Sequence, residues 1–453
     1  MFIPKNKLYT IIIGVYLIII SCKTSRQDSS PNVLIILADD LGWSQLSCYG
    51  SDFYDTPNID KLAQTGIKFT NAYSSASICS PTRAAIMTGK YPARIGLTDF
   101  IPGNSPKNKP LLTPDNWQRF LPLDEITIAE KIKSSGYATG FFGKWHLSQE
   151  KQPPKSLLHN PNMQGFSESF VTYKPSKNLI QQWQAENKDF HNVDTITKRA
   201  LDFLNQYQKS PFFLFLSHNT IHDPLIENEK SINKYRNKDG SEKNQNNPII
   251  GAMIKTLDKS VGQIVKKLES LKSLDNTIII FYSDNGGKHA HASQKPFRKG
   301  KGWLYEGGIR VPTIATWPNK IKAGTKSNHP SIFYDYFATV CDVLGVKPPY
   351  PIDGISYYAS LTGKPQQQHD YLYWEFPAYG GQQAIRMGSW KGFKKNLFKG
   401  MSDLQLYDLS KDPKELNDLS AKYPEIVQKM ENFLDQAHTT ASQENFRIPI
   451  LEE

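Results

Sequence analysis

Two short acidic segments carry side chains that could hold a metal ion. Asp39 and Asp40 directly follow one apolar run, and Asp284 and Asn285 follow another. Carboxylate and amide oxygens suit a hard divalent cation such as calcium. Asp-Asp can instead form a turn or a helix cap, and Ser-Asp-Asn-Gly-Gly can form a tight turn. Because both clusters come at the ends of apolar runs, we favour one shared metal site.

The same order of residues recurs four times: an apolar run that predicts a buried strand, followed at once by polar side chains. These runs cover residues 32–37, 139–142, 212–216 and 277–282. Helix-like segments lie among them, at 127–134, 194–207 and 249–271. This alternation predicts strand–helix–strand crossovers and a largely parallel sheet. Ligands of open α/β sheets bind outside the carboxyl ends of the strands, so we expect the polar clusters to meet at one sheet edge.

A third candidate is the segment from Cys79 to Arg83, which reads Cys-Ser-Pro-Thr-Arg and is followed by Thr-Gly-Lys-Tyr-Pro at residues 88–92. A free cysteine at the start of a helix is usually a small, inert hydrophobe. The whole pattern, however, resembles the signature of the sulfatase family. The resemblance implies that a maturation enzyme oxidises Cys79 to formylglycine (3-oxoalanine), an aldehyde. It also implies that Ca²⁺ is held by the two acidic clusters, with residue 79 as an added ligand.

The resemblance further implies a mechanism. One hydroxyl of the hydrated aldehyde attacks the sulfur of a sulfate ester, and Asp284 is the base. The metal lowers the pKa of that hydroxyl and orients the sulfate oxygens. Deprotonation of the second hydroxyl then expels sulfate and regenerates the aldehyde.

Three more segments resemble sulfatase motifs: Gly-Lys-Trp-His at Lys144 and His146, His-x-Pro at His222, and Lys-Gly-x-x-Tyr-Glu-Gly-Gly beginning at Lys301. The resemblance assigns Arg83 and Lys144 to stabilising the hydrated aldehyde and His146 to sulfate elimination as a base. It assigns His222 and Lys301 to sulfate binding and to proton donation to the leaving oxygen. Preorganised cations of this kind oppose the charge that develops on the sulfuryl oxygens and on the leaving alcohol.

The alternation of predicted strands and helices ends near residue 352. Strand-like runs at 371–376, 383–387 and 404–409 and one helix at 424–437 predict an antiparallel sheet with a packing helix. The predicted fold is α/β, with a large, mixed, mostly parallel sheet flanked by helices at 31–351. A smaller C-terminal subdomain follows at 352–453. Segments 384–391 and 406–415 resemble the C-terminal subdomain of sulfatases, and the resemblance implies an alkaline phosphatase-like fold.

The N-terminus predicts export. Lys5 and Lys7 precede an apolar run at residues 8–20 that is too short for a membrane span, which indicates a signal peptide at 1–22. The end of this segment resembles a bacterial lipobox, which implies lipidation of Cys22 and a tether at 23–30. Simple cleavage and secretion is the alternative. We expect the bacterial cell envelope, in the periplasm or on the outer membrane surface, with a lipid anchor as the only membrane contact.

Composition limits the partners. The 453 residues are 39% hydrophobic and 21% charged, typical of a soluble globular protein larger than one core. A net charge of +11 favours anionic partners, either nucleic acid or acidic polysaccharide. No helix-turn-helix, zinc-finger or RNA-binding signature is present, so we expect a sulfated oligo- or polysaccharide and no nucleic acid. Cys48 and Cys341 could pair in an oxidising compartment, but they form no disulfide framework.

The leading hypothesis is a sulfuric ester hydrolase of galactose or N-acetylgalactosamine sulfates or of algal polysaccharides, because residues 92–103 resemble polysaccharide sulfatases. The alternatives are a small-molecule arylsulfatase, a phosphodiester or phosphonate hydrolase of the same superfamily, and an inactive glycan-binding lipoprotein. Segments 102–121, 149–170 and 225–248 are expected to be long loops that wall the substrate cleft. Aromatic side chains that could stack on a sugar ring are Trp43, Trp117, Trp303 and Tyr305.

Overall fold

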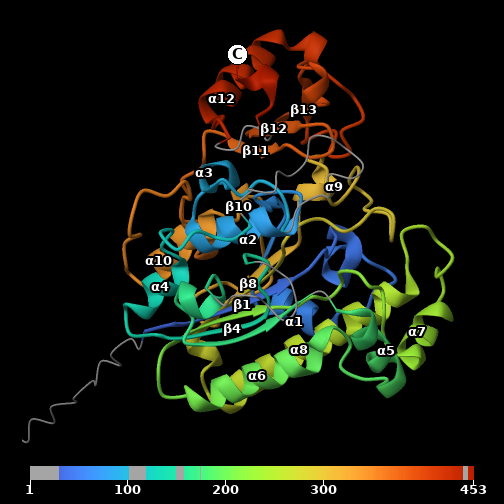
Figure 1. Ribbon diagram of the computed structural model, residues 1–453, viewed down its shortest axis with the longest axis vertical. Helices are drawn as coiled ribbons and strands as arrows, with labels where there is room; N and C mark the ends of the chain where they lie inside the picture. The colour runs from blue at the N-terminus through green and yellow to red at the C-terminus, as the bar shows by residue number, and fades with distance from the viewer. Residues whose placement is uncertain (1–29, 102–118, 149–157, 174, 442–446, 453) are drawn as a thin grey trace, which may run out of the picture.

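The computed structural model describes residues 30–101, 119–148, 158–173, 175–441 and 447–452 (Figure 1). The predicted signal peptide with Cys22, the tether up to residue 29, and Trp117 lie outside these residues. Among the described helices, none combines the length and the apolar character that crossing a bilayer requires.

An eight-stranded sheet forms the centre of the molecule, in the order β5-β4-β6-β1-β7-β8-β2-β9. Neighbouring strands are parallel except at β8, which runs antiparallel to both β7 and β2. The predicted large, mostly parallel sheet is therefore confirmed. Its strands are β1 (Asn32–Ala38), β2 (Ile67–Phe69), β4 (Ala138–Lys144), β5 (Glu168–Thr172), β6 (Phe212–Ser217), β7 (Thr277–Ser283), β8 (Thr313–Thr316) and β9 (Thr325–Ser327).

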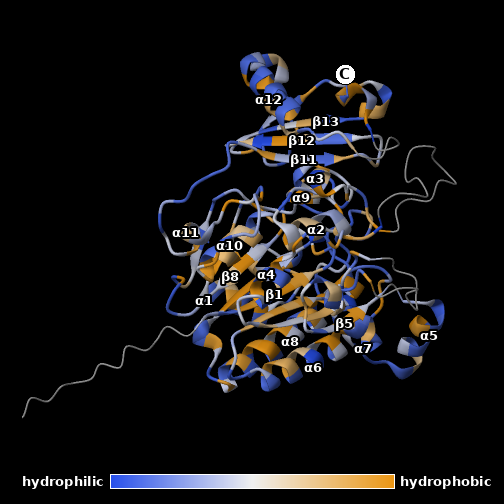
Figure 2. Ribbon diagram, turned by 60° about the vertical axis from the view of Figure 1, so that its left-hand side comes forward, coloured by the Kyte–Doolittle hydropathy of each residue, from blue (hydrophilic) through white to orange (hydrophobic). Residues whose placement is uncertain are grey.

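Helices cover both faces of this sheet (Figure 1). On β1, Val33 and Ile35 face a core shared with α2, α4 and α10, whereas Leu34 and Ile36 face a core shared with α1, α6 and α8. A strand buried on both faces is continuously apolar, which explains the apolar runs in the sequence and the apolar colouring of the central strands in Figure 2. These helices are α1 (Pro57–Thr65), α2 (Cys79–Thr88), α4 (Ile128–Lys133), α6 (Val193–Gln206), α8 (Pro248–Ser270) and α10 (Asp335–Val343).

One expected loop is partly helical. Residues 225–248 contain α7 (Glu229–Arg236), so the prediction of a long loop was wrong there. Asn228 caps this helix, and Tyr235 packs so closely on α8 that a Cβ at Gly251 would lie 2.6 Å from its ring. The sequence contains no clear helix signal here, because only two of the eight residues of α7, Ile232 and Tyr235, are buried and the other side chains are largely polar. The remaining short helices are α3 (Pro92–Ile95), α5 (Lys177–Glu186), α9 (Glu306–Ile309) and α11 (Tyr358–Leu361), and β3 (Ala72–Tyr73) pairs with β10 (Ser331–Ile332).

The C-terminal part forms a four-stranded antiparallel sheet, β11-β12-β13-β14, as predicted. One face packs on α12 through Ile385 and Met430, and the other packs on the large part of the molecule through Trp374 and Phe376. The predicted boundary after residue 351 stays a prediction. The elements are β11 (Leu372–Phe376), β12 (Gln382–Met387), β13 (Trp390–Lys395), β14 (Gln405–Asp408) and α12 (Pro424–Ala437).

A buried ion network joins the two parts. Lys391 on β13 is fully buried, with its Nζ 2.9 Å from Glu306 Oε1 and 2.8 Å from Glu415 Oε1. Burial raises the pKa of Glu415 to about 7. Burial would also raise the pKa of Glu306, but Lys391 and Arg310 hold it at about 2. One lysine therefore compensates two buried carboxyl groups.

We expect Lys391→Met to lower the free energy of unfolding by about 3–5 kcal/mol, because Glu306 and Glu415 would lose their shared cation. Equilibrium urea denaturation measures this loss. Lys411→Met is the control, since that side chain is 83% exposed; it should change stability by about 0.5 kcal/mol or less. A loss below about 1 kcal/mol for Lys391→Met would contradict the assignment.

Candidate active site

The predicted polar clusters meet at one edge of the large sheet. Asp39 and Asp40 follow β1, Asp284 and Asn285 follow β7, and Lys144 ends β4. Strands β4, β6, β1 and β7 are neighbours, so their carboxyl ends lie together. The backbone at Asp40 has a φ of 63°, a left-handed conformation that is uncommon for residues other than glycine and is often found at functional sites.

Cys79 is the first residue of α2, a helix in which every residue is buried. Its Sγ lies 3.3 Å from Lys301 Nζ and 3.6 Å from Asp39 Oδ1. The positive end of the helix dipole therefore points into the acidic cluster. Burial raises the pKa of the Cys79 thiol to about 12. A protonated thiol is a poor nucleophile, so without a bound cation the unmodified side chain has little nucleophilic character.

The acidic cluster has the properties of a cation site. Asp39, Asp40, Cys79 and Asp284 each offer one ligand atom, and these atoms all lie within 4.8 Å of one another. Asp40 Oδ2 and Asn285 Oδ1 are buried and accept no hydrogen bond from any residue that the structure describes. Unsatisfied buried acceptors are costly, and a hard divalent cation prefers such oxygens. The predicted ligand set therefore fits a divalent cation.

Three cations surround these carboxylates. Lys144 Nζ lies 2.8 Å from Asp39 Oδ2, and Lys301 Nζ lies 2.6 Å from Asp40 Oδ1. Arg83 donates from Nε and Nη2 to Asp284 Oδ2, at 3.0 and 2.7 Å. Arg83 thus fixes Asp284 from behind, whereas the two lysines face the cleft.

The carboxyl groups respond differently to this environment. Burial would raise the pKa of Asp39, but Lys144, His222 and Arg83 hold it well below its usual range. Burial and the Asp39 carboxylate raise the pKa of Asp284 to about 6, although Arg83 opposes the shift. A bound divalent cation would favour the ionised form of Asp284.

Two histidines complete the cluster. His222 Nε2 lies 3.9 Å from Asp40 Oδ2, and His146 Nε2 lies 2.5 Å from the carbonyl oxygen of Ile101. Burial and the nearby charge of Lys144 lower the pKa of His222 to about 4 and that of His146 well below its usual value. Both imidazoles are therefore neutral at pH 7, and an anionic ligand would raise their pKa values by offsetting the lysine.

The cluster opens into a cleft with two lobes of about 160 and 500 Å³. Phe100, His146 and His222 line both lobes, and Cys79 and Lys301 line the larger one. Of the described residues in segment 225–248, none lines either lobe, so the prediction that this segment walls the cleft was wrong.

The sequence prediction missed several site residues. Ser217, at the end of β6, accepts from Arg83 Nη1 at 2.5 Å and donates to the Lys144 carbonyl oxygen at 2.6 Å. Its position after an apolar run was the available signal. Phe376 and Tyr379 line the larger lobe but belong to none of the motifs, and Phe100, in the segment 92–103, lines it without having been singled out as a site residue.

The four candidate stacking aromatics have different positions. Trp303 lines the larger lobe. Trp43 packs on Tyr49 and Phe297, and Tyr305 is buried beneath Arg298; neither lines either lobe of the cleft. Trp117 lies outside the described residues. Cys48 and Cys341 are both free thiols.

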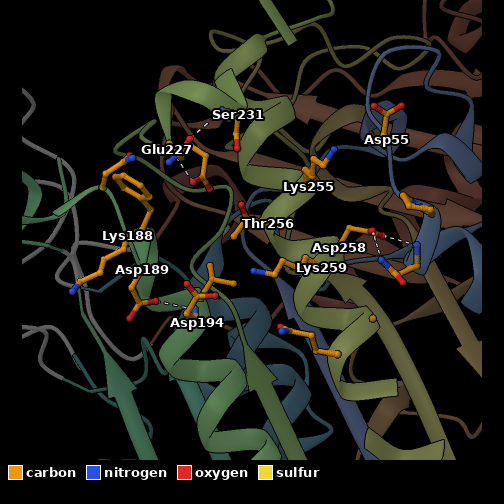
Figure 3. A pocket seen from close by; sticks show the side chains of 18 of the residues that line it. Asp55, Lys188, Asp189, Asp194, Glu227, Ser231, Lys255, Thr256, Asp258 and Lys259 are labelled. Atoms are coloured by element: carbon orange, nitrogen blue, oxygen red, sulfur yellow. Dashed lines mark hydrogen bonds between the residues drawn. The ribbon is translucent and has the colours of Figure 1, made fainter. Parts of the chain in front are cut away.

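A larger cavity of about 750 Å³ lies beside α1, α6 and α8 (Figure 3) and shares no residue with the acidic cluster. Asp258, one of its carboxylates, accepts from the backbone N–H groups of Asn58 and Ile59, at 2.9 and 2.8 Å, and so caps α1. The candidate active site is therefore identified by the side chains of the acidic cluster and not by the volume of the cavity.

The fold is α/β, and the cluster places residues that suit a divalent cation beside a basic cleft that suits an anion. The family model described as Sulfatase matches residues 31–346, and one described as N-sulphoglucosamine sulphohydrolase, C-terminal, matches residues 298–440. The chain therefore belongs to the sulfatase family and is a sulfuric ester hydrolase.

Individual relatives are similar in sequence to this protein over most of its length. An N-acetylgalactosamine-6-O-sulfatase of Bacteroides thetaiotaomicron is 29% identical, over 92% of this chain and 95% of its own. The N-acetylgalactosamine-6-sulfatase of Homo sapiens is 28% identical, over 90% and 85%. A solved structure of Ps i-CgsB in complex with k-i-k-neocarrahexaose is 28% identical, over 89% and 93%, with a TM-score of 0.75.

We expect Asp39→Asn, Asp40→Asn and Asp284→Asn each to weaken the binding of a divalent cation by about 10- to 100-fold or more, because each removes a carboxylate charge from the acidic cluster. Isothermal titration calorimetry on metal-free protein measures the affinity without reference to activity. Asp202→Asn is the control, on the exposed face of α6. Wild-type affinity in all three variants would show that the cation binds elsewhere.

Proposed function

We propose that this sulfatase removes sulfate from sulfated glycans, with Cys79 converted to formylglycine and Ca²⁺ as its metal. The observation that carries the proposal is the position of Cys79, buried at the start of α2 between Lys301 and the carboxylate of Asp39. A residue that is inert as a thiol lies where a sulfate ester would meet the lysines and the metal ligands. Its conversion requires a formylglycine-generating maturation enzyme as a partner.

Three observations support a glycan as the substrate. Two relatives are named as N-acetylgalactosamine sulfatases, and Ps i-CgsB was solved with a neocarrahexaose. The larger lobe is about 500 Å³ and has aromatic and basic walls. The chain carries a net charge of +11, which suits a polyanion. Galactose or N-acetylgalactosamine sulfates, from glycosaminoglycans or algal polysaccharides, are therefore the leading candidates.

The metal ligands proposed are Asp39, Asp40, Asp284 and Asn285, together with residue 79. When bound, Ca²⁺ lowers the pKa of the nucleophilic hydroxyl and orients the sulfate oxygens. Formylglycine supplies, in its hydrated form, one hydroxyl for attack on sulfur and a second for release of sulfate.

In the proposed mechanism, different side chains of this site transfer protons and stabilise the developing negative charge. Asp284 accepts the proton of the attacking hydroxyl, and Arg83 holds its carboxylate in place. Lys144 and Lys301 oppose the negative charge that develops on the sulfuryl oxygens, in a site that excludes most water.

The leaving alcohol needs a proton, and the final step releases one. His222 and Lys301 line the larger lobe and donate to the leaving oxygen. The anionic ester favours the protonated form of His222, because it offsets the charge of Lys144 that lowers its pKa. His146 is neutral and accepts the proton of the second hydroxyl when sulfate is expelled.

We also propose that the protein is anchored in the bacterial cell envelope through a lipid on Cys22, with secretion after cleavage as the alternative. The basic, short apolar N-terminus with its lipobox-like end supports this location.

We expect Cys79→Ser and Cys79→Ala to abolish multiple turnover and to leave the fold intact. A serine hydroxyl lacks the second oxygen that expels sulfate, and alanine offers no nucleophile. Sulfate release measures turnover, and circular dichroism checks the fold. Substantial turnover by Cys79→Ala would exclude the mechanism.

We expect the matured protein to release sulfate from at least one sulfated oligosaccharide with a kcat/KM about tenfold or more above that for nitrophenyl sulfate, because sugar contacts contribute binding energy at the reacting centre. A panel of galactose-, N-acetylgalactosamine- and algal-type sulfated oligosaccharides tests this. Equal efficiency on the aryl ester, or no release from the panel, would indicate a small-molecule sulfatase.

A further inference from the structure

Two aromatic rings from distant parts of the chain lie together in the cleft. Trp303 follows Lys301 by two residues, and Tyr379 lies in the turn between β11 and β12. Their ring centroids are 6.2 Å apart, and the ring planes are only 21° from parallel. Both rings line the 500 Å³ lobe that also contains Cys79. The C-terminal sheet therefore contributes to the wall of the active-site cleft.

The backbone holds Tyr379 in an unusual, exposed position. Its φ is 54°, which is rare for a bulky residue, and its side chain remains 53% exposed. Gly380 and Gly381 follow with φ values of 91° and 79°, a turn that residues with a Cβ adopt poorly. The ring lies directly over Gly302, where a Cβ would come within 2.7 Å of Tyr379 Cε2. Burial does not explain this arrangement, because about half of the residue's surface remains accessible to solvent.

Trp303 is fixed by the same sheet. Gln382, at the start of β12, is fully buried; its Nε2 donates to the Gly302 carbonyl oxygen at 3.0 Å, and its Oε1 accepts from the Leu304 N–H at 3.0 Å. The Gly302 N–H donates to the Ser77 carbonyl oxygen at 2.8 Å, two residues before Cys79. The peptides on both sides of Trp303 are thus held relative to β12 and to the nucleophile. The aromatic pair is preorganised.

Exposure increases from the bottom of the lobe to its mouth. Cys79 is 2% exposed, the Lys301 side chain 14% and Tyr379 53%. If a sulfate lies at Cys79 and Lys301, its sugar extends toward the more exposed part of the lobe, where Trp303 and Tyr379 lie. A cavity of this size is in the range that holds ligands larger than a monosaccharide.

The chemistry of the pair suits a pyranose. The apolar C–H face of a sugar packs on a flat aromatic surface through dispersion and loss of water. Lys299 Nζ lies 4.9 Å from the Trp303 ring, and Lys288 and His289 also line the lobe, so groups that bind hydroxyls or a second sulfate are close.

We propose that Trp303 and Tyr379 form a subsite for the sugar next to the one that carries the scissile sulfate. The inference rests on the proposed function, because it takes the cleft as a glycan desulfation site. It assigns the C-terminal sheet a direct part in choosing oligosaccharides over monosaccharides.

Matched substrates of two lengths test the subsite: N-acetylgalactosamine 6-sulfate and galactose 6-sulfate, against chondroitin 6-sulfate and carrageenan tetrasaccharides. Tyr379→Asn keeps the left-handed backbone accessible and removes the ring, and Trp303→Ala removes the other ring. We expect each variant to lose about tenfold more kcat/KM on a tetrasaccharide than on the matching monosaccharide, through KM. Tyr379→Phe and Trp303→Phe keep a ring and should stay within about threefold of the wild type. Equal losses of kcat/KM on the tetrasaccharide and the monosaccharide, or no loss on either, would contradict the proposed subsite.

A binding measurement separates this inference from the proposed function. In the Cys79→Ala background, isothermal titration calorimetry with the same tetrasaccharides reads affinity without turnover. Weaker tetrasaccharide binding after Tyr379→Asn supports the subsite even if the wild type releases no sulfate, a result that would contradict only the proposed function. Unchanged affinity, or no binding of any tetrasaccharide, overturns the subsite even if the enzyme is an active sulfatase.

Discussion

The structure depends on a balance of buried charge at the ends of β1 and β7. Three carboxylates, on Asp39, Asp40 and Asp284, face Arg83, Lys144 and Lys301, so the side chains sum to zero. Buried ions are tolerated only when paired, because the loss of hydration is large. A divalent cation adds two positive charges, which a monoanionic sulfate ester and an ionised nucleophile would balance. Burial and the Asp39 carboxylate raise the pKa of Asp284 to about 6, and a divalent cation beside these carboxylates would lower it again.

The same balance links the two parts of the molecule. Lys301 and Glu306 belong to one short segment, so the contact that pins Glu306 to Lys391 in the C-terminal sheet also positions the lysine beside Cys79. Gln382 ties down the residues between them. The C-terminal sheet therefore completes the catalytic site.

The sequence was sufficient to predict both the fold and the site wherever an apolar run was followed directly by side chains that could bind a metal or an anion. Strands buried on both faces are continuously apolar, and the residues after them, such as Asp39 and Asp284, lie at the edge where parallel strands end. The helix predicted at 424–437 coincides with α12, which begins at Pro424, a residue favoured at the first helical position. Partners far apart in sequence left no local signal. Strand β13 was missed because it carries Lys391 and Lys394, which pair with Glu306 and Glu431 across the fold, and Tyr379 belongs to no motif.

The central claim is that Cys79, buried at the start of α2 beside Lys301 and Asp39, is the precursor of the nucleophile. Mass spectrometry of the tryptic peptide at residues 69–83 tests it, on protein made in a host that contains the maturation enzyme. We expect a peptide that is lighter than the cysteine form by the mass of H₂S less that of one oxygen atom. This peptide should resist thiol alkylation. Its fraction of the total peptide should rise in proportion to the specific activity of the preparation. A fully active enzyme whose peptide retains an alkylatable Cys79 would contradict it.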